Sequence, residues 1–175
     1  ELRQAVEMYN RGYLKPAQAA FQQIVESSKP AEVKSMALTY LGIMADDEGK
    51  FNLAADFFDR AIKFDERNFY AHYNMAIALR HKGMYKEALQ ALERAQKLRP
   101  DLVEPQSLKG QLQYQNQDLK GAEATLKQAI ETSKDPLAYY NLGMVYKKDG
   151  KFAEAKASFL DALNVAASGE IAFKA

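Results

Sequence analysis

FYAHYNMAIALRHKGMYKEALQALERAQKLRPDL, residues 69–102, is the stretch of sequence that decides the fold. Its second part places Ala88, Leu92 and Ala95 at the i, i+4, i+7 spacing of an amphipathic helix, and its first part carries a similar apolar stripe. Gly83 separates the two parts. The stretch therefore predicts a helical hairpin, in which neither helix can bury its apolar stripe alone.

Four columns of residues show that this hairpin is repeated along the chain. The first column is a small residue in each expected first helix: Ala5, Gly42, Ala76, Gly110 and Gly143. The second lies at each turn: Gly12, Gly49, Gly83, Gln117 and Gly150. The third is an alanine in each second helix: Ala17, Ala54, Ala88, Ala122 and Ala155. The fourth is a large residue one turn later: Phe21, Phe58, Leu92, Leu126 and Phe159. Every column steps by 37, 34, 34 and 33 residues, so the repeat is not a chance motif.

The columns have a physical explanation in close packing. A small residue lets the two helices of a hairpin approach closely, and the large residue fills the space between neighbouring hairpins. Glycine supplies the positive φ that ends a helix and turns the chain. We therefore expect helices at about 1–11, 15–28, 31–48, 51–64, 69–82, 85–98, 102–115, 119–132, 136–148 and 152–167.

Segments 39–62 and 140–163 closely resemble the consensus of the tetratricopeptide repeat family, whose 34-residue period also matches. The resemblance covers essentially the whole chain. It implies an all-α fold, a right-handed α-α superhelix (solenoid) of about five hairpins. We expect one solenoid domain over 1–175, with the repeats and the start of a truncated further helix at 1–34, 35–68, 69–102, 103–135, 136–169 and 170–175.

Two places depart from the pattern. The fourth repeat has Lys109 and Gln113 where the other repeats have mainly apolar residues. Its first helix is therefore either more polar inside or rotated so that Leu108 and Leu112 face inward, and we expect it to be the least stable element. At the other departure no polar capping helix follows the fifth repeat, so we expect an exposed apolar flank at residues 160 and 163.

Composition sets limits on the class of protein. The chain is 47% hydrophobic, which is ample material for a core, and its formal net charge of +1 gives no overall attraction to nucleic acid. It has no cysteine, which is compatible with either the cytoplasm or the periplasm. No apolar run approaches the length of a membrane helix, so we expect no direct membrane insertion by this segment. The chain begins at Glu1 without methionine, and we expect it to be a piece of a longer protein whose targeting segment is missing.

No residue pattern points to catalysis. His72 and His81 lie nine residues apart and would point to opposite faces of one helix, so they cannot share a metal ion. The acidic run at 46–48 lacks the spaced oxygen ligands of a calcium loop. No serine has a base placed by a motif, and no phosphate-binding loop occurs. We expect no catalytic residue, no metal and no cofactor, and a non-enzymatic segment.

The family resemblance implies a binding groove, because the first helices of such repeats line a concave face. Mapped onto this chain, the groove would hold Tyr40, Ile43, Tyr70, Tyr73, Asn74, Ile77, Arg80, Gln111, Tyr114, Tyr140, Asn141, Met144 and Lys147, with Met36, Thr39 and Leu108 beside them. Large amphipathic side chains of this kind are favoured at protein-binding surfaces. The alternative for each tyrosine is packing between adjacent helices, and for Asn74 it is a hydrogen bond to a local backbone group.

Family members that grip a C-terminal carboxylate use a lysine and an asparagine on one first helix, an asparagine on the next, and a lysine and an arginine on the third. The corresponding positions here are Thr39, Ile43, Asn74, Glu104 and Leu108. Only Asn74 matches, so we do not expect a receptor for chaperone tails.

The leading functional hypothesis is a non-catalytic scaffold or adaptor that binds a peptide or helix of another protein in its concave groove. One alternative is a self-assembling module that forms a homo-oligomer through its terminal repeats. Another is the substrate-recruiting arm of a larger enzyme. Nucleic-acid binding is not expected, because lysine and arginine form no continuous stripe.

Overall fold

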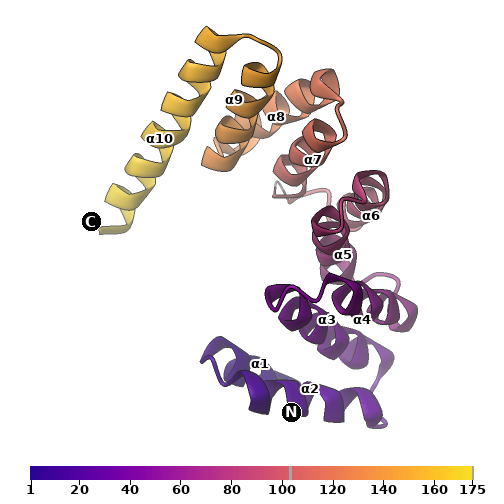
Figure 1. Ribbon diagram of the computed structural model, residues 1–175. Coiled ribbons are helices and arrows are strands. Elements are labelled where there is room, and N and C mark those ends of the chain that lie inside the picture. The colour runs from indigo at the N-terminus through magenta and orange to yellow at the C-terminus, as the bar shows by residue number, and fades with distance from the viewer. Residues whose placement is uncertain (103, 175) are drawn as a thin grey trace. The chain divides into compact units, whose positions relative to one another are not determined.

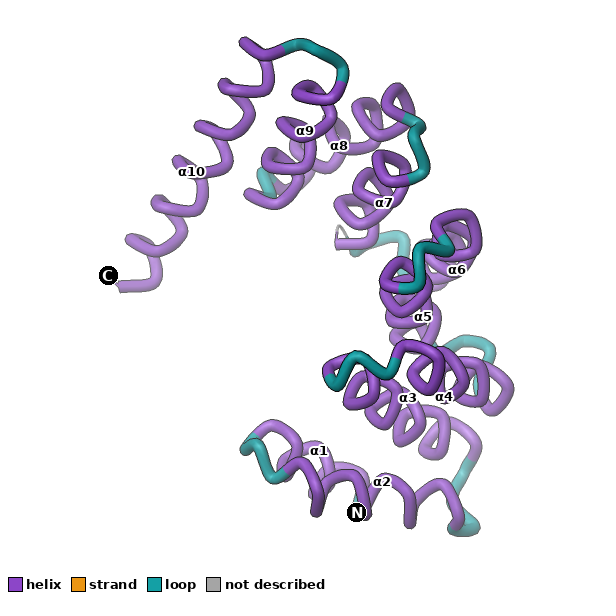
Figure 2. Tube along the Cα trace, viewed as in Figure 1, coloured by secondary structure: helices purple, strands orange, loops and turns teal. Residues whose placement is uncertain are grey.

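The computed structural model describes residues 1–102 and 104–174, and all of the regular secondary structure within them is helical (Figure 1). The helices are α1 (Leu2–Asn10), α2 (Leu14–Glu26), α3 (Ala31–Asp47), α4 (Phe51–Phe64), α5 (Phe69–His81), α6 (Tyr85–Leu98), α7 (Glu104–Gln115), α8 (Leu119–Ser133), α9 (Pro136–Lys148) and α10 (Phe152–Lys174). Short loops join them in pairs, as Figure 2 shows. The expected all-α helical-repeat fold is confirmed. No helix in this part of the chain is long and apolar enough to cross a membrane.

The turn column is where the chain reverses within each hairpin. Gly12, Gly49, Gly83 and Gly150 have φ of 81°, 74°, 73° and 77°, a region that glycine enters without steric cost. Gln117 takes the same conformation, with φ 68°, although it has a side chain. The position in the repeat thus dictates the backbone, and the fourth hairpin accepts a less suitable residue there.

The small-residue column lets the first helix of each hairpin lie against the large residue of the second. A Cβ added at Gly42 would overlap the Phe58 ring, and one added at Gly110 would overlap the Leu126 side chain. The three other large residues of the column differ in depth, since Phe21 and Leu92 are fully buried and Phe159 is half-buried. The close packing inferred from the repeat is therefore present in the hairpins.

The helices form two compact units, which we call unit 1 (Glu1–Arg99) and unit 2 (Pro100–Ala175). Unit 1 contains α1–α6 and unit 2 contains α7–α10. The division falls directly after the third hairpin, where Pro100 has no N–H with which to continue α6. Each unit has its own apolar core.

Helix α7 in unit 2 shows which of the two alternatives for the first helix of the fourth repeat is correct. Leu108 and Leu112 are buried while Lys109 is half-buried, so the helix is rotated as the second alternative proposed. The amide oxygen of Gln113 remains buried without a hydrogen-bond partner among the described residues.

Helix α10 differs from the prediction at its end. We expected a helix to stop near residue 167 and a separate one to start at 170, but α10 continues without interruption to Lys174. The physical reason is that this stretch has no proline and only Gly169 as a helix breaker, and one glycine costs about 1 kcal/mol relative to alanine. Residue 175 lies outside the described residues.

Candidate functional site

In unit 1 the expected groove residues of α3 are engaged in packing. The Tyr40 ring stacks on Phe21, with ring centroids 4.9 Å apart, and meets Tyr9 edge-on at 5.6 Å. Ile43 is half-buried against the core of α3 and α4. The Tyr40 ring therefore packs between adjacent helices, which was the alternative considered for each tyrosine.

Helix α5 presents a cluster of aromatic rings. Tyr70 is 52% exposed and lies edge-on to Phe69, whose ring also stacks on Tyr73 at 5.7 Å. The Asn74 side-chain amide donates to the Tyr70 carbonyl oxygen over 2.8 Å, which is the local backbone bond foreseen as its alternative role. Ile77 and Arg80, further along the same helix, are half-buried.

Unit 2 contains the remaining candidates. On α7, Gln111 and Tyr114 are half-buried, and the Lys148 ammonium lies 5.0 Å from the Tyr114 ring centroid. On α9, Met144 is half-buried and Lys147 is exposed.

Two neighbouring residues of α9 differ sharply in exposure. Tyr140 is 50% exposed, whereas Asn141 is only 6% exposed. The Asn141 Nδ2 atom is buried and has no hydrogen-bond partner in the described part of the chain. Asn141 and Asn74 occupy the same column of the repeat, yet only Asn74 satisfies its amide locally.

Two other residues mapped to the groove are buried instead. Leu108 belongs to the core of α7, as described above, and Thr39 is 2% exposed. The Thr39 hydroxyl donates to the Ser35 carbonyl oxygen and accepts from the Asn68 amide over 3.0 Å. Both side chains are therefore structural, because they are buried against other residues of the fold.

Asn68 is a structural position that the sequence analysis missed. Its Oδ1 accepts from the Ala71 N–H and so caps α5, while its Nδ2 donates to Ser35 Oγ over 2.8 Å as well as to Thr39. The Ser35 hydroxyl donates in turn to the Ala61 carbonyl oxygen of α4. The cap position of Asn68 was the one signal in the sequence, because its partners lie far away along the chain.

An equivalent contact occurs in unit 2. Asp135 caps α9 by accepting from the Leu137 N–H, and its second carboxylate oxygen accepts from the Ser107 hydroxyl over 2.7 Å. In both units, then, the residue that caps the first helix of one hairpin is hydrogen-bonded to a hydroxyl group on the first helix of the preceding hairpin.

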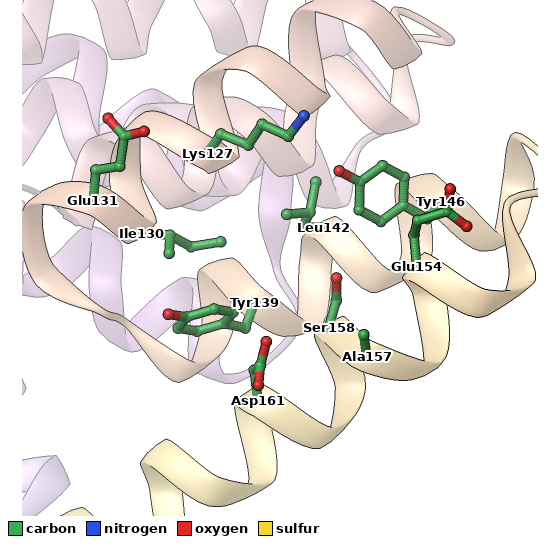
Figure 3. Close-up of a pocket in the computed structure, with 10 residues that line it drawn as sticks. All are labelled: Lys127, Ile130, Glu131, Tyr139, Leu142, Tyr146, Glu154, Ala157, Ser158 and Asp161. Atoms are coloured by element: carbon green, nitrogen blue, oxygen red, sulfur yellow. The ribbon is translucent and has the colours of Figure 1, made fainter.

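A pocket of about 320 Å³ lies on the other side of α9, between α8 and α10 (Figure 3). We call it the α8–α10 pocket. It is lined by Lys127, Ile130, Glu131, Tyr139, Leu142, Tyr146, Glu154, Ala157, Ser158 and Asp161. No local sequence motif predicts this pocket, because its walls come from three helices.

The histidines and acids do not assemble into a reactive group in the described residues. His72 is buried, with Nε2 3.0 Å from the Glu66 carbonyl oxygen, and His81 Nδ1 lies 3.2 Å from Asp46 Oδ1. No cluster of three potential metal ligands occurs among the residues whose placement is described.

Two family descriptions of the tetratricopeptide repeat match the chain, one over residues 69–102 and the other over residues 137–168. The chain is a tetratricopeptide repeat protein. It is 30% identical over 122 residues to a TPR repeat-containing protein of Methanocaldococcus jannaschii, a match that covers 70% of this chain and 22% of the relative. It is 31% identical over 93 residues to the photosystem I assembly protein Ycf3 of Prochlorococcus marinus, covering 51% of this chain and 54% of that protein.

The fold also matches solved structures. The structure of MamA from residue 41 to its end, from Desulfovibrio magneticus RS-1, superposes with a TM-score of 0.82 at 19% identity, covering 95% of this chain and 93% of the other. At that identity the likeness shows the fold alone. Proteins of the family are generally non-catalytic, and the repeats make this chain a protein-interaction scaffold.

Proposed function

We propose that the scaffold binds a peptide or helix of a partner protein on the faces of its first helices, without catalysing a reaction. The binding residues would be those of α5 in unit 1 and of α7 and α9 in unit 2. The curated relatives extend well beyond the matched region, so this assignment concerns the segment and not a whole protein. The name of the Prochlorococcus marinus relative, an assembly protein, supports a role in bringing proteins together.

The observation that carries the proposal is the unpaired amide of Asn141. A buried N–H donor without an acceptor costs roughly 1–3 kcal/mol, so it is rarely kept in a fold without a reason. Because Nδ2 itself has almost no accessible surface, a carbonyl oxygen of a bound peptide would satisfy it once the side-chain amide rotates towards solvent. The exposed Tyr140 ring beside it offers a flat, rigid contact surface with a polar tip.

Exposed aromatic residues on α5 give independent support. Tyr70 projects half of its surface to solvent next to the stacked Phe69 and Tyr73 rings. Aromatic side chains are enriched among the residues that contribute most to protein–protein binding. Asn74 contributes less than Asn141, because one of its N–H donors is already bound to Tyr70.

The experiment uses a partner recovered by affinity capture with the 175-residue chain and then purified. Asn141→Leu removes the donor but keeps the volume, and it should weaken partner binding by ~1–3 kcal/mol in calorimetric titration. The same change should leave stability unchanged or raise it, because it eliminates an unpaired buried polar group. Asn74→Leu is the matched control in the same column.

The opposite result would assign Asn141 to the fold. If Asn141→Leu lowers the denaturation midpoint and leaves affinity intact, the first-helix face of unit 2 is not the binding site. Equal affinity losses for Asn74→Leu and Asn141→Leu would mean that the unpaired amide is not what distinguishes the two positions.

A second candidate function is self-association, and the surface of α10 favours it. Leu160 and Leu163 are 49% and 66% exposed on this helix, as expected for the apolar flank after the fifth repeat. Light scattering over a range of concentrations tests this function directly. A molar mass that rises with concentration, and that Leu160→Glu with Leu163→Glu returns to that of one chain, would support it.

A further inference from the structure

The α8–α10 pocket has an apolar floor and an acidic rim. The floor is formed by Ile130 and Leu142, and the Tyr139 ring stands beside them (Figure 3). Glu131 of α8 and Glu154 and Asp161 of α10 contribute three carboxylates to the lining. Glu154, Ser158 and Asp161 are spaced i, i+4, i+7, so α10 turns one face towards the pocket.

The three carboxylates carry uncompensated charge. None of them forms an ion pair with a described residue. Lys127 also lines the pocket, but its ammonium lies 2.6 Å from Glu123 Oε1, and this charge is therefore already matched. The lining is thus negative, and charge complementarity selects a cationic ligand.

Ser158 supplies an independent polar group inside the pocket. It is only 6% exposed, and its hydroxyl takes part in none of the side-chain hydrogen bonds of the described residues. Figure 3 shows the hydroxyl directed from α10 towards Leu142 and the Tyr146 ring. The hydroxyl oxygen is not one of the fully buried atoms that lack a partner, so it keeps contact with solvent and is available as an acceptor for an incoming N–H.

We propose that the α8–α10 pocket binds an arginine side chain presented by a partner protein. The guanidinium group carries five N–H donors in a planar fork, which suits carboxylates together with a hydroxyl acceptor. Its flat face can lie on the Tyr139 ring, and its aliphatic stem can cover the apolar floor. Lysine offers a compact point charge without the planar fork, so arginine is the better match.

This docking site is separate from the first-helix face proposed above. Its walls come mainly from second helices, and its recognition is of a cation, whereas Asn141 would recognise a backbone carbonyl oxygen. The failure of either proposal therefore leaves the other standing.

The test is an NMR titration of the 175-residue chain, labelled with ¹⁵N, with the probe N-acetyl-arginine amide. We expect saturable shifts at the backbone amides of Glu131, Glu154, Ser158 and Asp161. N-acetyl-citrulline amide has nearly the same shape but no charge, and it should bind at least about fivefold more weakly. Absence of saturable shifts at these amides, or equal binding of the two probes, would overturn the proposal.

Charge-removing variants distinguish arginine binding in the pocket from a general effect of surface charge. Glu154→Gln with Asp161→Asn should weaken arginine binding by about fivefold or more, since two charge interactions are lost. The matched control is Glu87→Gln with Glu93→Gln, two exposed acids on α6 in unit 1, and it should change binding by less than about twofold. Equal effects of the two pairs would assign the binding to net charge and overturn the proposal.

A third variant blocks the pocket by volume alone. Ala157 is exposed at the lining, so Ala157→Leu should narrow the space without disturbing the core. We expect an unchanged melting midpoint and arginine binding weakened by about fivefold or more. Full binding by this variant would place the arginine elsewhere.

Discussion

Asn68 shows how much one side chain contributes to the contact between repeats. It caps α5 through the Ala71 N–H and reaches Ser35 and Thr39 on α3, while Ser35 extends the chain of hydrogen bonds to α4. All three polar residues are nearly inaccessible to solvent. A buried network of this kind stabilises a fold only if each member keeps its partners.

Removing Asn68 should therefore cost more than removing an ordinary helix cap. We expect Asn68→Ala to lower the free energy of unfolding by ~2–4 kcal/mol, because the cap is lost and two buried hydroxyls lose a partner. Asp118 caps α8 from an exposed position, through the Gly121 N–H, and Asp118→Ala should cost about 1 kcal/mol. Urea denaturation of both variants measures the difference, and equal losses would show that the network adds nothing to the cap.

Glu123 links stability to pH. The hydrogen bond from Lys127 lowers the pKa of the Glu123 carboxyl, and the nearby Lys127 and Lys151 charges act in the same direction although burial opposes them. A carboxyl with a lowered pKa in the folded state stabilises the protein above its unfolded pKa, and this contribution is lost as the pH falls through the folded value.

The expected consequence is a stability difference that depends on pH. Glu123→Gln should be less stable than the unmodified chain by about 0.5 kcal/mol at pH 7, since the pair is partly exposed. The difference should begin to shrink as the pH falls below the unfolded pKa of about 4.3, and it should vanish only below the lowered folded pKa, where the carboxyl is protonated in both states. Thermal unfolding across this pH range measures it, and a difference that persists unchanged at low pH would contradict the ion-pair origin.

At the scale of elements, the separation of the two helices in a hairpin is set by small residues. Ala88 of α6 is fully buried, and Gln90 on the same helix is exposed. Ala88→Leu should destabilise by ~1–3 kcal/mol, because the added volume forces the pair apart. Gln90→Leu should lie within about 0.5 kcal/mol of the unmodified chain. Equal denaturation midpoints for the two variants would show that the columns are wrongly assigned.

Helix α7 contains a position that sequence and structure both mark as unfavourable. Gln113 occupies a column in which other repeats have Leu79 and Tyr146, and its amide oxygen is buried without a partner in the described residues. Gln113→Leu should raise the free energy of unfolding by about 1 kcal/mol. Gln128→Leu, exposed on α8, is the control and should have little effect. A destabilised Gln113→Leu would indicate that the amide has a partner in solution.

The helices and hairpins were predictable because their packing residues repeat with a constant local spacing. The rotation of α7 could not be predicted, since Leu108 and Lys109 are adjacent and the pattern allowed either to face inward. The length of α10 was underestimated because its end was inferred from the repeat period of the family. No helix-breaking residue in the sequence marked that end.

The candidate site was less predictable for a different reason. Its residues were placed on the right helices, but hydrogen bonding distinguishes Asn74 from Asn141, and both stand in the same column. The Asn68 network joins residues about one repeat apart, and the α8–α10 pocket requires three helices at once. These features depend on side-chain geometry between elements, which periodicity does not contain.

At the scale of the whole molecule, the two units differ in the number of hairpins that they contain. Unit 1 has three hairpins and the Asn68 network, whereas unit 2 has two hairpins. The stability of repeat proteins is approximately a sum of repeat and nearest-neighbour terms, and three repeats are about the minimum for an independent fold.

We therefore expect residues 1–99 to fold alone and residues 100–175 to be much less stable alone. Circular dichroism should show the fragment 1–99 with helicity in proportion to its length and a cooperative urea transition, and the fragment 100–175 with a clearly lower midpoint. Residues 1–90, which end inside α6, are the matched control. Because Leu92 and Ala95 are then lost from the third hairpin, this shorter fragment should lose stability out of proportion to its length. If 1–99 does not fold, or if 1–99 and 1–90 unfold at the same urea concentration, the boundary at Arg99 is not a boundary of stability.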